Sequence, residues 1–454
     1  KFHFGWGRGY DGQGDGRIPL LRCVLRRAAA RCVGICHRCA AGRKSMNQQT
    51  KKTGTKNNYY CVRNGIRKIF LHFLIIYGFT EKVNDNKNLP GVSELRALPI
   101  SCYNRRMKRE IFIGGVGIGG NHPVSIQSMT STSTRDVAAT LKQIEALQEV
   151  DCDIVRVAVP DQDCVPAFAE IVKKSSLPVV ADIHFNADLA LRAIESGAQG
   201  IRINPGNISS KEKLKKILIL ANQRNITVRI GVNSGSIEKK YWREKGSRAE
   251  IMVKSVMDKV KFFEDNDFFN IKISLKSSNV METVTAYRLI DKACDYPLHL
   301  GITEAGTLFS GTVKSAVGIG SLLLDGIGHT IRVSLTDDPV QEVKVAKEIL
   351  KVTGHRASGI EIISCPTCSR TSVDLITIVN EVEKKLASIK TKKRIVVAIM
   401  GCEVNGPGEA READLGIAFS KSSGYIFRKG KKTEKIAPRD AADRLLELIE
   451  KEIT

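Results

Sequence analysis

From Met107 onward, short runs of apolar and β-branched residues alternate with longer stretches in which apolar residues recur every three or four positions. The short runs are typical of strands and the longer stretches of amphipathic helices, such as those expected over 135–150 and 339–354. Eight strands are predicted, at residues 124–128, 153–159, 178–185, 200–206, 226–233, 269–278, 297–306 and 330–336. Eight strand–helix units over about 230 residues have the rhythm of a (β/α)8 TIM barrel. A doubly wound sheet is the competing architecture, but it usually has fewer repeats.

A second pattern begins after Gly354, where the chain leaves the predicted barrel. A strand is expected at 359–364, a helix at 372–388 and another apolar strand at 394–401. This is the pattern of a smaller α/β domain. We therefore predict a TIM-barrel domain over 107–353 and a second domain over 354–454.

The first 106 residues show neither a two-residue nor a 3.6-residue apolar period for long. We therefore expect them to be a basic, mostly disordered extension, or untranslated sequence upstream of Met107. Residues 1–110 hold 23 Lys/Arg against 6 Asp/Glu, so +17 of the net charge of +23 lies there. Such a charge normally suggests nucleic acid or an anionic membrane. Because the patterned chain is only mildly basic, neither is expected as a partner.

The apolar run 69–79 is about half a membrane span, so a cytoplasmic protein is predicted.

The extension also contains Cys32, Cys36 and Cys39, with the C-x3-C-x2-C spacing that radical S-adenosylmethionine enzymes use for an iron–sulfur cluster. Those cysteines follow the first strand of a barrel, and no strand is predicted before Cys32. We interpret the spacing as a coincidence in a segment rich in cysteine and arginine.

Polar side chains gather at the predicted C-terminal ends of the barrel strands, where TIM barrels place their chemistry. Burying so much positive charge is costly unless an anion compensates it, and the planar arginine fork suits phosphate oxygens. We therefore predict a substrate with at least two anionic groups, most simply a diphosphate. For any one arginine the alternative is a structural ion pair, and His184 is equally consistent with a core histidine. The strand-end residues are Arg156, His184, Arg202, Asn204, Arg229, Asn233, Lys276, Glu304, Arg332 and Ser334, with Glu304 as the only acid.

Three cysteines in the second domain follow predicted strands: Cys365 and Cys368 after the first, and Cys402 after the other. A zinc site would require a fourth Cys or His, and residues 403–454 contain neither, although Glu403 and Glu409 are present. Three thiolates and one replaceable oxygen ligand suit a [4Fe–4S] cluster. A Cys365–Cys368 disulfide is the structural alternative, and the chain shows no secretory context that would favour it.

The motifs CPTCSR and GCEVNGPGEA, behind a barrel with QSMT, ADIHF, RINPGN, PLHLGITEAG and RVSL, resemble the 4-hydroxy-3-methylbut-2-enyl diphosphate synthase family of non-mevalonate isoprenoid biosynthesis. The resemblance covers Met107 to about residue 450 and matches the two-domain bacterial type. It implies reductive ring opening of 2-C-methyl-D-erythritol 2,4-cyclodiphosphate with loss of water. It also implies that Cys365, Cys368, Cys402 and Glu409 ligate the cluster, with Glu409 replaceable by a substrate oxygen.

The same resemblance implies that Arg156, Arg202, Arg229 and Lys276 hold the diphosphate and that Glu304 is a candidate acid. Ferredoxin or flavodoxin would supply two electrons, and a homodimer is expected in which one subunit's cluster domain caps its partner's barrel. Two alternatives remain open on the residues alone. One is a zinc-stabilised barrel acting as a phosphate lyase or aldolase, and the other is a nucleic-acid-binding protein that uses the basic extension.

Overall fold

The structure is a computed structural model that describes residues 107–453 except 184–185, 205–207, 209, 242, 357–358, 387–388, 390, 392 and 403–412. The predicted extension 1–106, with Cys32, Cys36 and Cys39, lies outside the described residues. Within them, none of the helices combines the length and the apolar character that a membrane span requires. The predicted boundary between residues 353 and 354 falls between helix α11, which ends at Val352, and strand β11, which begins at Gly359.

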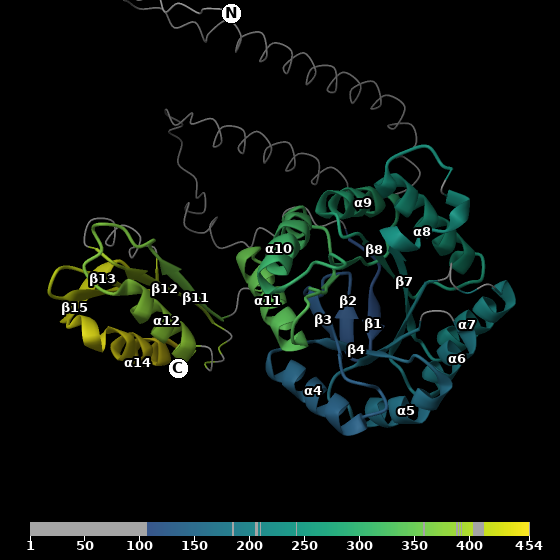
Figure 1. Cartoon of the computed structure of the whole chain (residues 1–454), viewed down its shortest axis with the longest axis horizontal. Helices are drawn as coiled ribbons and strands as arrows, with labels where there is room; N and C mark the ends of the chain where they lie inside the picture. Colours follow the sequence, from purple (N-terminus) through teal and green to yellow (C-terminus); the bar gives the residue numbers. More distant parts are fainter. Residues whose placement is uncertain are drawn as a thin grey trace, which may run out of the picture. The chain divides into compact units, whose positions relative to one another are not determined.

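Eight parallel strands form the predicted barrel, surrounded by a ring of helices (Figure 1). Neighbouring strands follow the order β8-β7-β6-β5-β4-β3-β10-β9, and a bridge between Ile273 and Leu298 joins the two ends of this series. This confirms the TIM barrel over the doubly wound sheet. The strands are β3 (Ser125–Met129), β4 (Ile154–Ala158), β5 (Val179–Asp182), β6 (Gly200–Ile203), β7 (Thr227–Asn233), β8 (Ile271–Lys276), β9 (His299–Leu300) and β10 (Thr330–Ile331).

The helices begin where the sequence provides caps. Ser247 and Glu250 form a reciprocal capping box at the start of α8, and Asp338 followed by Pro339 begins α11. The barrel helices are α4 (Val137–Glu149), α5 (Val165–Lys174), α6 (Ala187–Glu195), α7 (Lys211–Gln223), α8 (Arg248–Glu264), α9 (Val280–Ala293), α10 (Leu308–Leu324) and α11 (Pro339–Val352).

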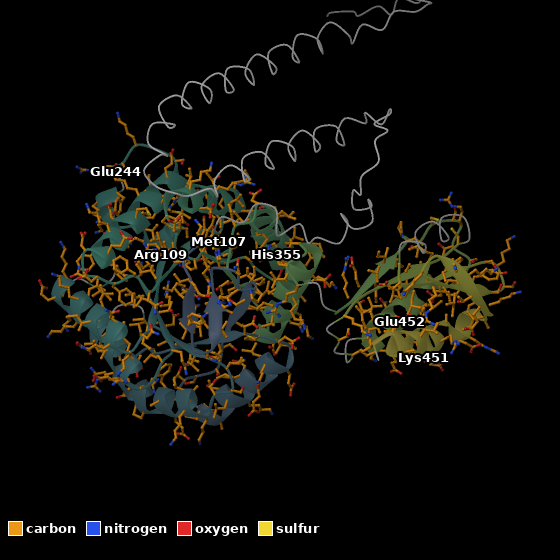
Figure 2. The ribbon with its side chains drawn as sticks, turned by 180° about the vertical axis from the view of Figure 1, so that it is seen from behind. Met107, Arg109, Glu244, His355, Lys451 and Glu452 are labelled. Carbon is orange, nitrogen blue, oxygen red and sulfur yellow. The ribbon has the colours of Figure 1, made fainter. Side chains whose placement is uncertain are left out.

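Alternate residues of each barrel strand point to opposite faces of the sheet. On β7, Val228, Ile230 and Val232 belong to the apolar core shared with the helices. Arg229, between the first two, therefore faces the barrel interior. The same alternation holds on β8, where Ile271 and Ile273 join that core and Lys272 lies between them. Side chains fill the ring of helices, as Figure 2 shows from the opposite side.

A short hairpin covers the end of the barrel at which the strands begin. Strands β1 (Ile111–Ile113) and β2 (Val116–Ile118) pair antiparallel, and their isoleucines pack against Ile154 and Val180 at the starts of β4 and β5. Thr227, the first residue of β7, donates its hydroxyl to the carbonyl of Phe112 at 2.7 Å. This hairpin leaves the opposite end, where the strands finish, as the one available for a substrate.

The second domain is a five-stranded sheet in the order β11-β12-β13-β14-β15, of which the first three strands are parallel. Both helices share one apolar core with one face of the sheet, which confirms the smaller α/β domain. The elements are β11 (Gly359–Ser364), α12 (Leu375–Leu386), β12 (Arg394–Met400), β13 (Leu415–Phe419), β14 (Gly424–Arg428), β15 (Lys431–Ile436) and α14 (Ala441–Ile453).

Candidate active site

Three of the predicted arginines lie deeper than expected. Arg156, Arg202 and Arg229 are each the third residue of their strands, β4, β6 and β7, and not at the strand ends where we predicted them. Arg156 and Arg229 are buried, at 7% and 4% exposure. Their charge therefore lies inside the barrel, where water cannot compensate it.

Four charged residues on neighbouring strands form one row across the barrel wall. The pairing register places Asp182 of β5 opposite Arg202 of β6, Arg202 opposite Arg229 of β7, and Arg229 opposite Lys272 of β8. All four face the interior by strand alternation. We call them the charged row. It carries one acid at the β5 end and three basic residues after it.

The expectation that Glu304 is the only acid at the site was wrong, because two buried carboxylates contact the arginines. Asp182, 3% exposed, accepts from Nη1 of Arg202 at 3.2 Å and lies 3.7 Å from Nε of Arg156. Glu342 at the start of α11 lies 3.5 Å from Nη2 of Arg332. The structural ion pair that we considered for single arginines is therefore formed by Arg156, Arg202 and Arg332.

Burial and mutual repulsion lower the pKa values of several interior cations. Burial lowers the pKa of Arg156 to about 10, although Asp182 opposes the shift. The pKa of Arg229 falls well below its usual range, first because of burial and then because Arg156 and Arg202 repel its charge. Lys272 and Lys276 show lowered pKa values for the same two reasons. The interior is therefore a place where an anion would be strongly stabilised.

Several interior polar atoms have no hydrogen-bond partner among the described residues. These are Nε and Nη1 of Arg229, Nζ of Lys272, both ring nitrogens of His299 and both amide atoms of Gln127. All four side chains are at most 4% exposed. Buried polar groups are nearly always paired, so unpaired donors in one interior identify a place suited to a polar ligand or to water.

The other predicted substrate contacts sit nearer the strand ends. Lys276 and Asn233 are the last residues of β8 and β7, and Asn204 follows β6 directly. Asn204 is buried and accepts a hydrogen bond from Lys259 Nζ at 3.4 Å. Ser334 is half-buried in the segment between β10 and α11. His184 lies outside the described residues.

Glu304 occupies a strained backbone conformation. It lies exposed between β9 and α10 with φ +52°, in the left-handed region that non-glycine residues rarely adopt. Such conformations cost free energy and concentrate at functional sites. The geometry is consistent with a functional role for Glu304 but does not place its carboxylate against a substrate.

The second domain brings two of its three cysteines to one edge of the sheet. β11 and β12 are parallel, with Ser364 opposite Ile399, so Cys365 and Cys402 follow adjacent strand ends. The backbone N–H of Gly401 donates to Sγ of Cys365 at 3.2 Å. Both cysteines are free thiols, as is Cys368, so the Cys365–Cys368 disulfide is not formed.

Cys368 is exposed, and the backbone N–H of Arg370 lowers the pKa of its thiol, which favours the thiolate that metals bind. Within the described residues, His, Cys, Asp and Glu nowhere form a closed group of three that would hold a metal ion. Residues 403–412, with Glu403 and Glu409, lie outside the described part of the chain. The donor set, with free thiols and an N–H directed at sulfur, fits an iron–sulfur cluster.

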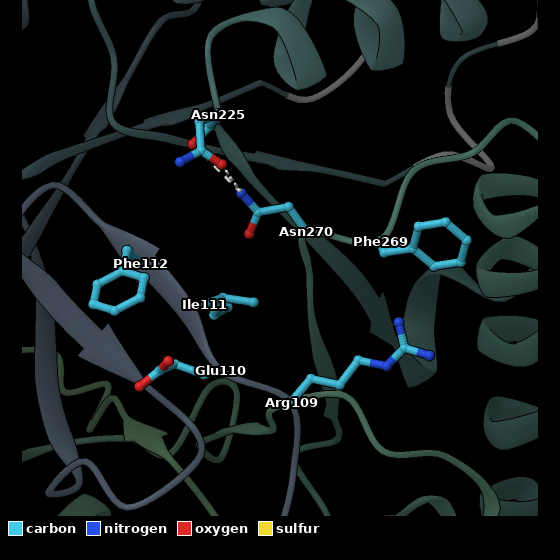
Figure 3. Close-up of a pocket in the computed structure, with 7 residues that line it drawn as sticks. All are labelled: Arg109, Glu110, Ile111, Phe112, Asn225, Phe269 and Asn270. Carbon is cyan, nitrogen blue, oxygen red and sulfur yellow. Dashed lines mark hydrogen bonds between the residues drawn. The ribbon is translucent and has the colours of Figure 1, made fainter.

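A hollow of about 560 Å³ lies beside the β1–β2 hairpin, at the end of the barrel where the strands begin (Figure 3). Its lining includes Arg109, Phe112 and Phe269, and the Arg109 guanidinium carbon lies 5.4 Å from the Phe269 ring centre. The hollow is open and mixes apolar groups with two asparagines and the charged Arg109 and Glu110. It lies away from the charged row, and we assign it no part in the chemistry.

Comparisons with known proteins agree with this arrangement. Residues 108–347 match the GcpE TIM-barrel domain, and residues 361–451 match the GcpE protein C-terminal domain. The chain belongs to the GcpE family. A 4-hydroxy-3-methylbut-2-en-1-yl diphosphate synthase (flavodoxin) from Clostridium perfringens is 54% identical over 348 residues, covering 76% of this chain and 99% of the relative. The protein of that name from Geobacter sulfurreducens is 52% identical, covering 76% and 97%. This GcpE membership confirms the resemblance inferred from the sequence.

Sequence reasoning missed Asp182, Lys272, His299 and Gln127. Asp182 stands in the ADIHF motif two residues before His184, so the motif itself was the signal that could have identified it. Lys272 and Gln127 lie within strands, and a search confined to strand ends could not find them. A charged residue between two isoleucines, as in IKI at 271–273, is the signal that identifies such interior positions.

Proposed function

We propose that this chain opens the ring of 2-C-methyl-D-erythritol 2,4-cyclodiphosphate reductively and forms 4-hydroxy-3-methylbut-2-enyl diphosphate. The names of its relatives support the enzyme class and the product. The observation that carries the proposal is the charged row, in which buried basic residues outnumber the acid. A cyclic diphosphate provides the compensating negative charge.

The substrate's phosphates would be held by cations from four strands and from the residue that follows β10. Arginine donates in a planar fork that matches phosphate oxygens, and lysine adds a point charge. Neutral groups near the strand ends supply further hydrogen bonds that fix orientation. The proposed substrate-binding residues are Arg156, Arg202, Arg229, Lys276 and Arg332, with Asn204, Asn233 and Ser334 as the neutral contacts and His184 as a further contact.

Cys365, Cys368 and Cys402 would hold a [4Fe–4S] cluster, with Glu409 as the fourth ligand. When bound, the cluster supplies the two electrons of the reaction one at a time. The N–H of Gly401 directed at Cys365 is the kind of hydrogen bond that tunes such a cluster. The names of the relatives include flavodoxin, which supports flavodoxin over ferredoxin as the donor.

The chain's own residues then fix the reacting geometry. Breaking the ring C–O bond with the two electrons leaves the new diphosphate end on the arginines. The neighbouring hydroxyl group then takes up one proton and departs as water, which forms the C=C bond of the product. Glu304 is the proposed proton donor, because it follows β9 at the end of the barrel where the strands finish and has the left-handed backbone conformation that concentrates at functional sites. The barrel interior excludes water, which strengthens the contacts to phosphate.

A homodimer is part of the proposal, and an apolar stripe on α10 supports it. Phe309, Val313, Val317 and Leu324 are between 50% and 82% exposed along one side of this helix. Lys314 is its only charged residue among seventeen. A second copy presents the same uncharged surface, so pairing α10 with α10 of the partner would bury both stripes without burying a charge.

The test is anaerobic turnover of the full chain with reduced flavodoxin and the cyclic diphosphate, with the product followed by phosphorus NMR. We expect the linear diphosphate to appear and iron and sulfide, not zinc, to be bound. Turnover without reductant, or zinc in place of iron, would favour the lyase or aldolase alternative. Removal of residues 1–106 should leave the activity intact, because the charged row lies wholly within the barrel. A nucleic-acid-binding protein would instead lose its nucleic-acid binding when residues 1–106 are removed.

A further inference from the structure

Lys272 is a buried lysine to which the proposed function gives no role. It is the second residue of β8, 1% exposed, and its ammonium nitrogen has no hydrogen-bond partner among the described residues. We propose that Lys272 is a further substrate-binding residue, which together with Arg229 binds one of the two phosphate groups of the substrate. This inference rests on the proposed function and names two residues as one phosphate subsite.

The pairing register places the two residues side by side. Arg229 and Lys272 are directly opposite each other on β7 and β8, and both lie between apolar residues that belong to the outer core. Directly opposed residues on one face have β-carbons about 5 Å apart. Two long side chains rising from such positions can donate to oxygens of the same phosphate.

Arg229 and Lys272 differ from the interior arginines that have a carboxylate beside them. Asp182 pairs with Arg202 and lies near Arg156, while Glu342 lies beside Arg332. No carboxylate among the described residues makes an ion pair with Arg229 or Lys272. A negatively charged phosphate would therefore be stabilised most on the β7–β8 side of the barrel.

Lys276, on the same strand, points elsewhere. A β-carbon placed on Gly301, beyond β9, would come within 2.6 Å of the Lys276 ammonium nitrogen. Lys276 thus reaches toward β9 near the strand ends, four residues beyond Lys272. The two lysines are suited to different phosphate oxygens.

The fold alone gives no reason for a lysine at this position. A buried, unpaired ammonium destabilises a protein, and an apolar side chain of similar length would fit the same space at lower cost. The lowered pKa of Lys272, caused first by burial and then by Arg229, expresses that cost. Water can satisfy its hydrogen bonds but cannot compensate its charge, whereas a phosphate oxygen does both.

The experiment compares wild type, Lys272→Met and Lys344→Met as full chains carrying the oxidised cluster. Lys344 is exposed on α11, so its variant loses one positive charge away from the barrel interior. Calorimetric titration with the cyclic diphosphate should show affinity lowered roughly 10- to 100-fold in Lys272→Met and unchanged in Lys344→Met. Phosphorus NMR should show one bound resonance displaced more than the other. Without phosphate, Lys272→Met should melt no lower than wild type.

Equal affinity in Lys272→Met and wild type would overturn the inference, as would a lowered melting temperature with unchanged affinity. If Lys272→Met does not fold, the same titration with Lys272→Gln decides, and loss of folding in both assigns Lys272 a structural role. A wild type that fails to bind the cyclic diphosphate would instead contradict the proposed function. The two failures are therefore distinguishable.

Discussion

Asp182→Asn removes the carboxylate charge that Arg156 and Arg202 share inside the barrel. Asparagine keeps the shape of the side chain, so the change acts on charge and hardly on packing. Asp182 is 3% exposed, and both arginines remain in place with less compensation. We expect the barrel to be strongly destabilised.

The magnitude follows from the two distances. At an effective dielectric constant of about 20, charges 3.2 and 3.7 Å apart attract by about 5 and 4.5 kcal/mol. Removing the carboxylate also removes its own desolvation cost of several kcal/mol, which leaves a net loss of about 3–5 kcal/mol. At about 2–4 °C per kcal/mol, this corresponds to a melting temperature lowered by roughly 6–20 °C.

The assay is thermal unfolding of the full chain in phosphate-free buffer, followed by circular dichroism. Asp325→Asn is the matched control, because Asp325 pairs with Arg288 at 2.8 Å but is 40% exposed. That pair should contribute less than about 1 kcal/mol. If Asp182→Asn melts within the range of the control, the view of Asp182 as the charge that holds two buried arginines is wrong.

Three further variants test other parts of the account. The pKa of Lys272 is lowered by burial, so above pH 10.5 the lysine is neutral in both the folded and the unfolded chain, while below pH 10.5 the unfolded chain takes up the proton before the folded chain does. The stability advantage of Lys272→Met in urea should therefore grow as the pH falls below 10.5, by at most about 1.4 kcal/mol for each pH unit, and a constant difference would contradict the lowered pKa. Glu304→Gln should lower kcat by about 100-fold or more with unchanged iron content and melting temperature, and normal turnover would remove Glu304 from the chemistry. Val317→Asp should convert the dimer to a monomer in light scattering, and an intact dimer would place the interface elsewhere.

Much of the fold could be predicted because the strands carry local signals. Apolar runs bounded by helical periodicity located all eight barrel strands, and GIEIIS matched β11 residue for residue. Strands β13, β14 and β15 were not predicted. β15 is an edge strand with the polar sequence KKTEKI and no apolar alternation, so it forms only through pairing with β14. The capacity of such a segment to form a strand depends on its neighbour.

The site was less predictable because it depends on register. The sequence places Arg202, Arg229 and Lys272 on three strands, but only the stagger between strands puts them in one row with Asp182. A local pattern contains no information on that stagger. The cysteines were easier to find, since their positions after strand ends follow directly from the order of elements.

The most direct test is the electron paramagnetic resonance spectrum of the reduced full chain, recorded anaerobically before and after addition of the cyclic diphosphate. We expect a [4Fe–4S] signal with about four irons per chain, and a change of that signal on substrate addition that is lost in Arg229→Met. An unchanged signal in wild type that nonetheless binds the substrate would contradict the claim that the cationic barrel and the cysteine domain serve one reaction.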